Sequence, residues 1–185
     1  MSADYLQLAK EKRNASKEVD YTLPLVQFIA WCYINLTPGS YGLQLQKYIC
    51  HLKLKLKEIN KKLGLGDFKF SNTSGEFKAT YLSKDNFYSF THLRQWQPYK
   101  YYMLCLIDCD NDFTPEFYLI TKEDMGKFSL EYMNGTTEEN KNQENREQRL
   151  SIKKGSEKHK TLKEFNLLND TSYSSLVKYV KLNNI

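Results

Sequence analysis

The chain has 185 residues, a length that fits one domain and can bury a hydrophobic core. Hydrophobic residues make up 41% of the sequence, so its composition excludes an intrinsically disordered protein. Lysine and arginine number 27 against 22 aspartates and glutamates, and the formal charge of +5 permits a nucleic-acid partner without requiring one.

The N-terminal part, residues 1–62, is expected to be helical. Residues 4–17 place apolar side chains on one side and charges on the other, which is typical of an amphipathic helix. Residues 25–36 are apolar nearly all round and predict a buried core helix, with Pro24 suited to its first turn. A turn at residues 37–40 then separates this helix from the next one.

A long helix is predicted from about Tyr41 to Lys62. Its leucines and isoleucines recur at spacings of three and four, and its lysines make the opposite face basic. Gly64 and Gly66 are expected to end it, since glycine commonly follows the last helical residue.

Between residues 64 and 130 the pattern changes to that of strands. Segments rich in Phe, Tyr and Thr, or almost wholly apolar, predict five strands at residues 67–70, 75–81, 87–94, 99–108 and 116–120. Together with the helices they indicate a single α/β (α+β) domain, 1–185, with a central mixed five-stranded sheet flanked by helices. A capped helix with Thr121 as its cap is expected directly after the last strand.

The rest of the chain divides into a polar stretch and a C-terminal part. Residues 134–149 contain no apolar side chain, and they predict a mobile loop or insertion. Residues 150–185 predict a short strand and one or two helices.

Three charged residues on the first two strands are candidates for a catalytic site. Asp67 begins the first strand, and Glu76 and Lys78 lie two apart on the second, so they project from one face. If the two strands form a hairpin, Asp67 approaches both. Two carboxylates and the backbone carbonyl of Phe77 would then offer the hard oxygen ligands that Mg²⁺ prefers, and Lys78 could orient or help deprotonate an attacking water.

The run GDF, followed after seven residues by GEFKA, resembles the PD-(D/E)XK nuclease superfamily, most closely its small type II restriction endonucleases. The segments FTHLRQWQPYKYYMLCLID and EFYLITKEDM are similar to the strands and helix that follow in that family, so the resemblance spans about Tyr41 to Lys127. It implies a restriction-endonuclease-like core and a sequence-specific endonuclease of double-stranded DNA. The implied cofactor is Mg²⁺, with Mn²⁺ as a substitute and no nucleotide cofactor, and the implied assembly is a homodimer.

The chain departs from the family pattern at one point. The family often carries a further acidic residue on the helix before the aspartate, and Gln44 and Gln46 stand there instead. A neutral Gln46 can still hold a metal-bound water, so its expected role is a supporting one, and the number of metal ions stays open.

Two groups of polar residues are candidates for DNA contacts. His92, Arg94, Gln95 and Gln97 follow the predicted third strand, and Arg94 is also placed to contact the scissile phosphate or support the metal ligands. A basic cluster could follow the DNA backbone and consists of Lys153, Lys154, Lys158 and Lys160. The alternative for both groups is an ordinary surface, with cations paired to acids or solvated.

Two further functional classes remain open. One is a repair, junction-resolving or nicking nuclease on the same core, and the other is a catalytically inactive DNA-binding relative. The four cysteines show no zinc-ligand spacing, which favours a reducing cytoplasm. The polar N-terminus suggests no signal peptide, and no apolar run approaches the roughly 20 residues of a membrane helix.

Overall fold

The computed structural model describes residues 18–59, 65–70, 72–133, 146–164 and 177. The predicted amphipathic helix at residues 4–17 therefore lies outside the described residues. Helices of the described part are α2 (Leu25–Asn35), α3 (Pro38–Gln46), the π-helix η1 (Lys47–Lys53), α4 (Lys122–Met125) and α5 (Glu157–Glu164). None of them is long and apolar enough to cross a membrane.

The described strands form two sheets. The first is a mixed sheet with the strand order β1 (Phe68–Phe70), β2 (Thr73–Tyr81), β4 (Tyr101–Asp108), β5 (Thr114–Thr121). Strands β2 and β4 are parallel, whereas β1 and β2 are antiparallel, as are β4 and β5. The second is antiparallel, in the order β3 (Phe87–Leu93), β7 (Gln148–Lys153), β6 (Glu131–Tyr132).

The mixed α/β character is confirmed, but the single five-stranded sheet was wrong. All five predicted strands exist, and the error concerns their pairing, because β3 pairs with β7 instead of joining the first sheet. The physical reason is burial. The inward side chains of β3, Tyr88 and Phe90, lie opposite Ile152 and Leu150 of β7, and together they cover an apolar face of the first sheet.

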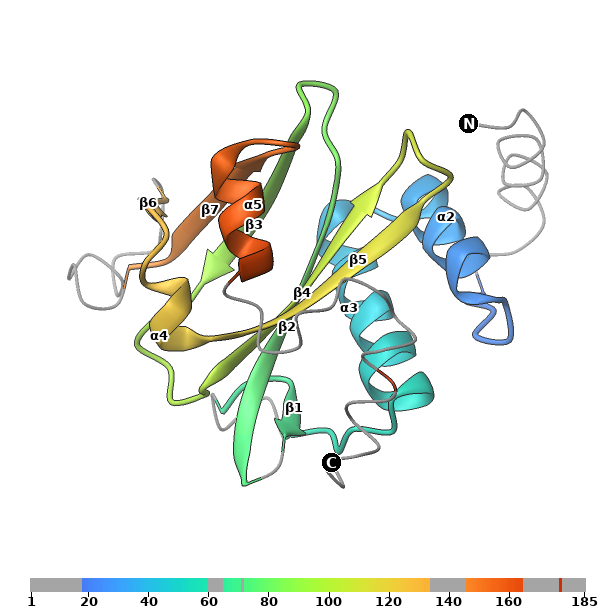
Figure 1. The fold of residues 1–185 in the computed structure, drawn as a ribbon. Helices are drawn as coiled ribbons and strands as arrows, with labels where there is room; N and C mark the ends of the chain where they lie inside the picture. Colours follow the sequence, from blue (N-terminus) through green and yellow to red (C-terminus); the bar gives the residue numbers. More distant parts are fainter. Residues whose placement is uncertain (1–17, 60–64, 71, 134–145, 165–176, 178–185) are drawn as a thin grey trace.

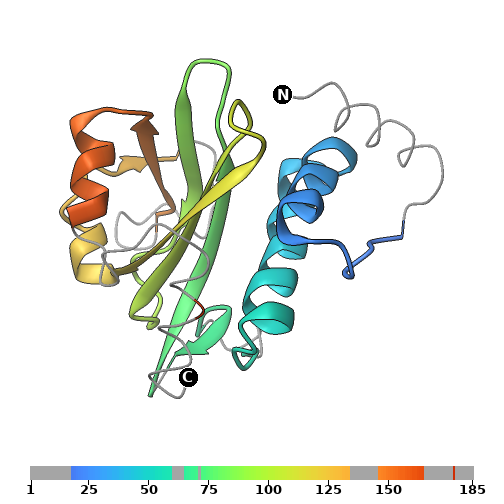
Figure 2. The same ribbon diagram turned by 45° about the vertical axis from the view of Figure 1, so that its right-hand side comes forward.

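The first sheet is the middle of three layers (Figures 1 and 2). Helices α2, α3 and η1 cover one of its faces, and the second sheet with α4 and α5 lies on the other. Strand β4 is buried on both sides: Met103 and Cys105 belong to the core beneath the helices, and Tyr102 and Leu104 belong to the core against the second sheet. Burial on two faces explains why this strand is almost wholly apolar in sequence.

The long helix expected to reach Lys62 ends at Lys53 instead. Leu54 and Leu56 are both buried, at 5% and 3% exposure, and residues two apart cannot share one helix face. Between them Lys55 takes a positive φ of 60°, which turns the chain back. The chain then runs beside β1, where the backbone N–H of Lys69 donates to the Lys57 carbonyl at 2.8 Å.

Gly66 does not end the helix as expected. Gly64 lies outside the described residues, and Gly66 belongs to the turn that enters β1, with a φ of 99°. A Cβ at Gly66 would lie 2.6 Å from the carbonyl oxygen of Gly75, so this close approach also requires glycine.

The predicted loop at residues 134–149 was wrong at its end. Strand β7 begins at Gln148. Glu147, directly before it, is buried at 8% exposure, so a polar side chain at this position does not mean that the chain is exposed to solvent. Residues 134–145 lie outside the described residues. The capped helix after β5 is present but short, and the Thr121 side chain caps it by accepting a hydrogen bond from the Asp124 backbone N–H at 3.0 Å.

Candidate active site

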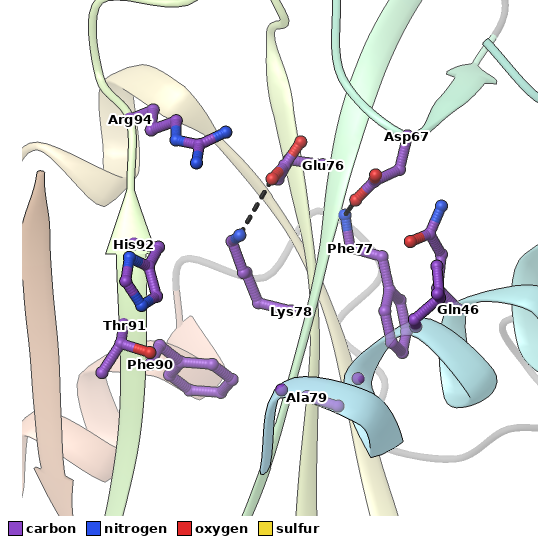
Figure 3. Close-up of a pocket in the computed structure, with 13 residues that line it drawn as sticks. Gln46, Asp67, Glu76, Phe77, Lys78, Ala79, Phe90, Thr91, His92 and Arg94 are labelled. Carbon is purple, nitrogen blue, oxygen red and sulfur yellow. Dashed lines mark hydrogen bonds and ion pairs between the residues drawn. The ribbon is translucent and has the colours of Figure 1, made fainter. Parts of the chain in front are cut away.

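Strand β2 presents Glu76 and Lys78 on the face that looks toward the second sheet. Their register partners on β4 are Tyr102 and Leu104, which belong to the core on that side. The Lys78 Nζ lies 2.9 Å from Glu76 Oε1 (Figure 3), and Glu76 is only 7% exposed. The two residues therefore share a face, as the spacing of two predicted.

The β1–β2 hairpin brings Asp67 to the edge of β2 next to this pair. The Asp67 backbone N–H donates to the Gly75 carbonyl at 2.8 Å, and the Phe77 backbone N–H donates to Asp67 Oδ2 at 2.9 Å. In a β-strand the backbone N–H and C=O of one residue point to the same edge of the strand. The Phe77 carbonyl therefore faces the edge that Asp67 occupies. Asp67 thus meets β2 through the backbone of Phe77 (Figure 3).

The hairpin is tight because of a glycine under an aromatic ring. Phe68 is fully buried and stands opposite Gly75 in the register. A Cβ at Gly75 would lie 2.4 Å from the Phe68 ring, so only glycine allows this packing. Packing of the Phe68 ring therefore fixes the backbone that carries Asp67.

These residues line one cleft of about 440 Å³. Its walls come from α3, the hairpin entry, β2 and the end of β3, and the polar side chains in it are Gln46, Asp67, Glu76, Lys78, Thr91, His92 and Arg94. Gln46 is the last residue of α3 and is 6% exposed. The structure thus brings the predicted catalytic residues and the supporting residue into one cleft with two DNA-contact candidates.

The sequence reasoning missed Glu147, which joins the two cations on the β3 side. Its Oε1 accepts from Arg94 Nε at 2.9 Å, and its Oε2 lies 2.6 Å from His92 Nδ1. Burial raises the pKa of Glu147, but the hydrogen bonds from His92 and Arg94 outweigh burial and hold that pKa below its ordinary value. Burial lowers the pKa of Arg94, yet the same pairing leaves it above its ordinary value.

No local sequence signal points to Glu147. It stands 53 positions from Arg94 along the chain, within a stretch that reads as uniformly polar. The only hint is its place directly before the alternating strand QRLSIK.

The remaining DNA-contact candidates do not line this cleft. The Gln97 carbonyl accepts a hydrogen bond from Lys122 Nζ, and the Gln95 Nε2 is buried without a hydrogen-bond partner. The basic cluster lies toward the far end of β7 and on α5. Lys154 pairs with Asp108 at 2.5 Å, Lys160 pairs with Glu157 at 2.5 Å, Lys158 Nζ donates to the Ser129 carbonyl at 3.3 Å, and Lys153 ends β7.

The oxygen atoms in the cleft suit a hard divalent cation. They are the carboxylates of Asp67 and Glu76, the Phe77 carbonyl and the Gln46 amide. Within the described residues no group of three or more His, Cys, Asp or Glu side chains could hold a metal, so such a cation would depend on the backbone and amide oxygens as well. No model of a known protein family and no curated protein matches the chain.

Proposed function

We propose that this protein is a magnesium-dependent endonuclease that hydrolyses phosphodiester bonds of double-stranded DNA. The observation that carries the proposal is the meeting of Asp67, Glu76, Lys78 and the Phe77 backbone in one cleft. Two carboxylates beside a lysine combine oxygen ligands for a cation with a positive charge for a phosphate. The resemblance of the GDF and GEFKA segments to the PD-(D/E)XK nucleases supports the same reading.

Asp67, Glu76 and the Phe77 carbonyl would hold Mg²⁺, with Mn²⁺ as a substitute. One oxygen of Glu76 pairs with Lys78, and the other makes no hydrogen bond within the described part of the chain. An open carboxylate oxygen on a cleft residue that is only 7% exposed is well suited to bind a cation there. When bound, the cation polarises the phosphodiester and lowers the pKa of a water.

Lys78 would act on the water or the phosphate. Its side chain is 19% exposed, and its ammonium group is held 2.9 Å from Glu76 Oε1. An ammonium at this position can orient the attacking water and neutralise charge on the phosphate oxygens. Arg94, across the cleft, would add a second positive charge on the same group.

The specific form we propose is a type II restriction enzyme acting as a homodimer. One active site cuts one strand, so two copies related by a twofold axis would cut both strands of a palindrome. The alternatives are a repair, junction-resolving or nicking nuclease, and a DNA-binding relative that does not cut. The nucleases differ from one another in which strands they cut and where, and the relative differs from all of them because it binds DNA without cutting.

The test is cleavage of unmethylated plasmid DNA by the purified chain in Mg²⁺, in Mn²⁺ and in EDTA. Discrete fragments in Mg²⁺ and none in EDTA are expected, and Glu76→Gln should not cut. Asp85→Asn is the matched control, because Asp85 is an exposed carboxylate in the turn between β2 and β3 and should cut normally. Nicks or smears would favour the other nucleases, and binding without cutting would favour the inactive relative. Equal cutting in EDTA would refute the proposal.

A further inference from the structure

The end of β3 has an unusual backbone where it forms the wall of the cleft. The register between β3 and β7 shifts between Phe90 and Leu93, which is a β-bulge, and His92 inside it has a φ of 55°. Such a φ is strained for a residue other than glycine, and bulges often re-aim side chains beside active sites. Here Phe90 and Leu93 are both buried, while the side chains of His92 and Arg94 reach Glu147.

Glu147 uses both carboxylate oxygens to hold these two side chains. Arg94 Nε donates to Oε1, and His92 Nδ1 donates to Oε2, because a carboxylate can only accept. The backbone of Glu147 is fixed too, since the Met133 N–H donates to its carbonyl at 3.0 Å. A carboxylate engaged at both oxygens cannot rotate freely, so Arg94 is held in one orientation.

Arg94 keeps its two terminal nitrogens available in this arrangement. Its contact with Glu147 uses Nε, and neither Nη atom makes a hydrogen bond to another described residue. The guanidinium group is directed toward Glu76 in the cleft (Figure 3), and its side chain is 41% exposed. Paired Nη donors at a partly exposed position match two oxygens of one phosphate.

We propose that Glu147 is a positioning residue that fixes Arg94 as a clamp for a phosphodiester group of the DNA. This inference rests on the proposed function and deepens it, because it adds an anion subsite opposite the Glu76–Lys78 pair. The backbone phosphate bound by Arg94 is either the one that is cut or its immediate neighbour. Glu147 itself touches no substrate and acts through Arg94.

The burial of Glu147 argues for orientation rather than a simple tie between strands. Glu147 is 8% exposed, and removing a carboxylate from water is costly even when it is paired. The same sheet contains an ordinary surface pair, Glu131 with Arg149, whose side chains are 55% and 48% exposed. That pair joins β6 to β7 without a buried charge.

The experiment compares Glu147→Gln with Glu131→Gln in single-turnover cleavage of plasmid DNA at saturating enzyme. The glutamine keeps the shape of the side chain and loses the charge that orients Arg94. We expect the Glu147 variant to cut about tenfold more slowly or worse, and Glu131→Gln to cut normally. Arg94→Ala should lose a similar factor, and combining it with Glu147→Gln should cost nothing further, since both changes remove one clamp. Glu147→Asp should recover part of the rate.

A second readout separates the clamp from the nuclease assignment. Affinity for a short duplex of randomised sequence is measured in EDTA with the same variants. If the wild type never cuts but Glu147→Gln and Arg94→Ala lose affinity non-additively, the clamp stands and the nuclease assignment fails. If the wild type cuts, and Glu147→Gln changes thermal stability but neither rate nor affinity, the clamp is overturned and the nuclease stands. Absence of both cutting and duplex binding overturns both.

Discussion

The two walls of the cleft carry charge in opposite ways. On the β2 wall, Glu76 pairs with Lys78 of the same strand, and one of its oxygens remains open toward the cleft within the described structure. On the β3 wall, Arg94 pairs through Nε with Glu147, and its terminal nitrogens remain open. The β2 wall thus offers an open acceptor beside the Lys78 ammonium, and the β3 wall offers open donors. A cation binds to acceptors and a phosphate binds to donors, so the proposed metal-dependent hydrolysis of a phosphodiester would use both walls.

The largest expected effect comes from removing a carboxylate of the β2 wall. Asp67→Ala or Glu76→Ala should lower single-turnover cleavage by roughly a thousandfold or more, because each removes an oxygen ligand of the proposed cation. Duplex affinity in EDTA should change little, since neither residue supplies positive charge to a phosphate. Normal cleavage by either variant would show that the β2 wall is an ordinary ion pair.

Lys78 is the second test of the β2 wall. Lys78→Met keeps the length of the side chain and removes its charge, and we expect cleavage to fall by about a hundredfold. Lys78→Arg should also be slow, because a planar guanidinium cannot replace a compact ammonium 2.9 Å from Glu76. Single-turnover rates at saturating enzyme distinguish slower chemistry from weaker binding. Wild-type rates in both variants would show that Lys78 is an ordinary surface lysine with no role in cleavage.

The two walls also differ in how far the sequence could predict them. Asp67, Glu76 and Lys78 lie within twelve consecutive positions, and strand alternation with one hairpin sufficed to bring them together. Glu147 could not be found this way, because its partner is 53 positions away and the pairing of β3 with β7 decides the contact. The ends of β3 and β7 were placed by burial of apolar residues across the layers, which no local pattern encodes.

The hairpin beneath the β2 wall allows a test of stability. Gly75→Ala would place a Cβ 2.4 Å from the buried Phe68 ring, so we expect unfolding free energy to fall by about 1–3 kcal/mol. Gly42→Ala is the matched control, because Gly42 lies inside helix α3 and a Cβ added there would have nothing within 4 Å. That change should stabilise the protein by about 1 kcal/mol or less. Denaturant unfolding of both variants measures the two changes in unfolding free energy, which should have opposite signs.

The β3 wall gives a smaller, pH-dependent effect. The pKa of Glu147 is depressed in the folded protein, so its pairing stabilises the fold above its ordinary value of 4.5 and is lost as pH falls through the folded-state value. We expect Glu147→Gln to be less stable than the wild type at neutral pH by about 1–2 kcal/mol. The difference should shrink in acid, which melting temperatures measured against pH will reveal. A difference that stays constant well below the ordinary pKa would contradict the pairing.

The smallest effect is expected outside the cleft, at the basic residues of α5. Lys160 is 63% exposed and pairs with Glu157 one turn away, and α5 packs beside β7, with its His159 3.4 Å from Glu116 of β5. Lys153 ends β7 roughly 17 Å along the strand from Gln148, which adjoins the β3 wall. Replacing Lys158 and Lys160 by alanine should therefore leave the single-turnover rate unchanged.

Duplex affinity of this double variant should fall only about twofold, and the slope of its logarithm against salt should drop by less than one per lysine. Arg94→Ala is the comparison, because it removes one charge inside the cleft and should reduce both the rate and the affinity. An affinity loss in the lysine variant as large as that of Arg94→Ala would mean that DNA runs across α5 and β7 as well. The anion-binding surface would then extend beyond Arg94 over the whole second sheet. The difference in charge would then lie between the two sheets and not only between the two walls of the cleft.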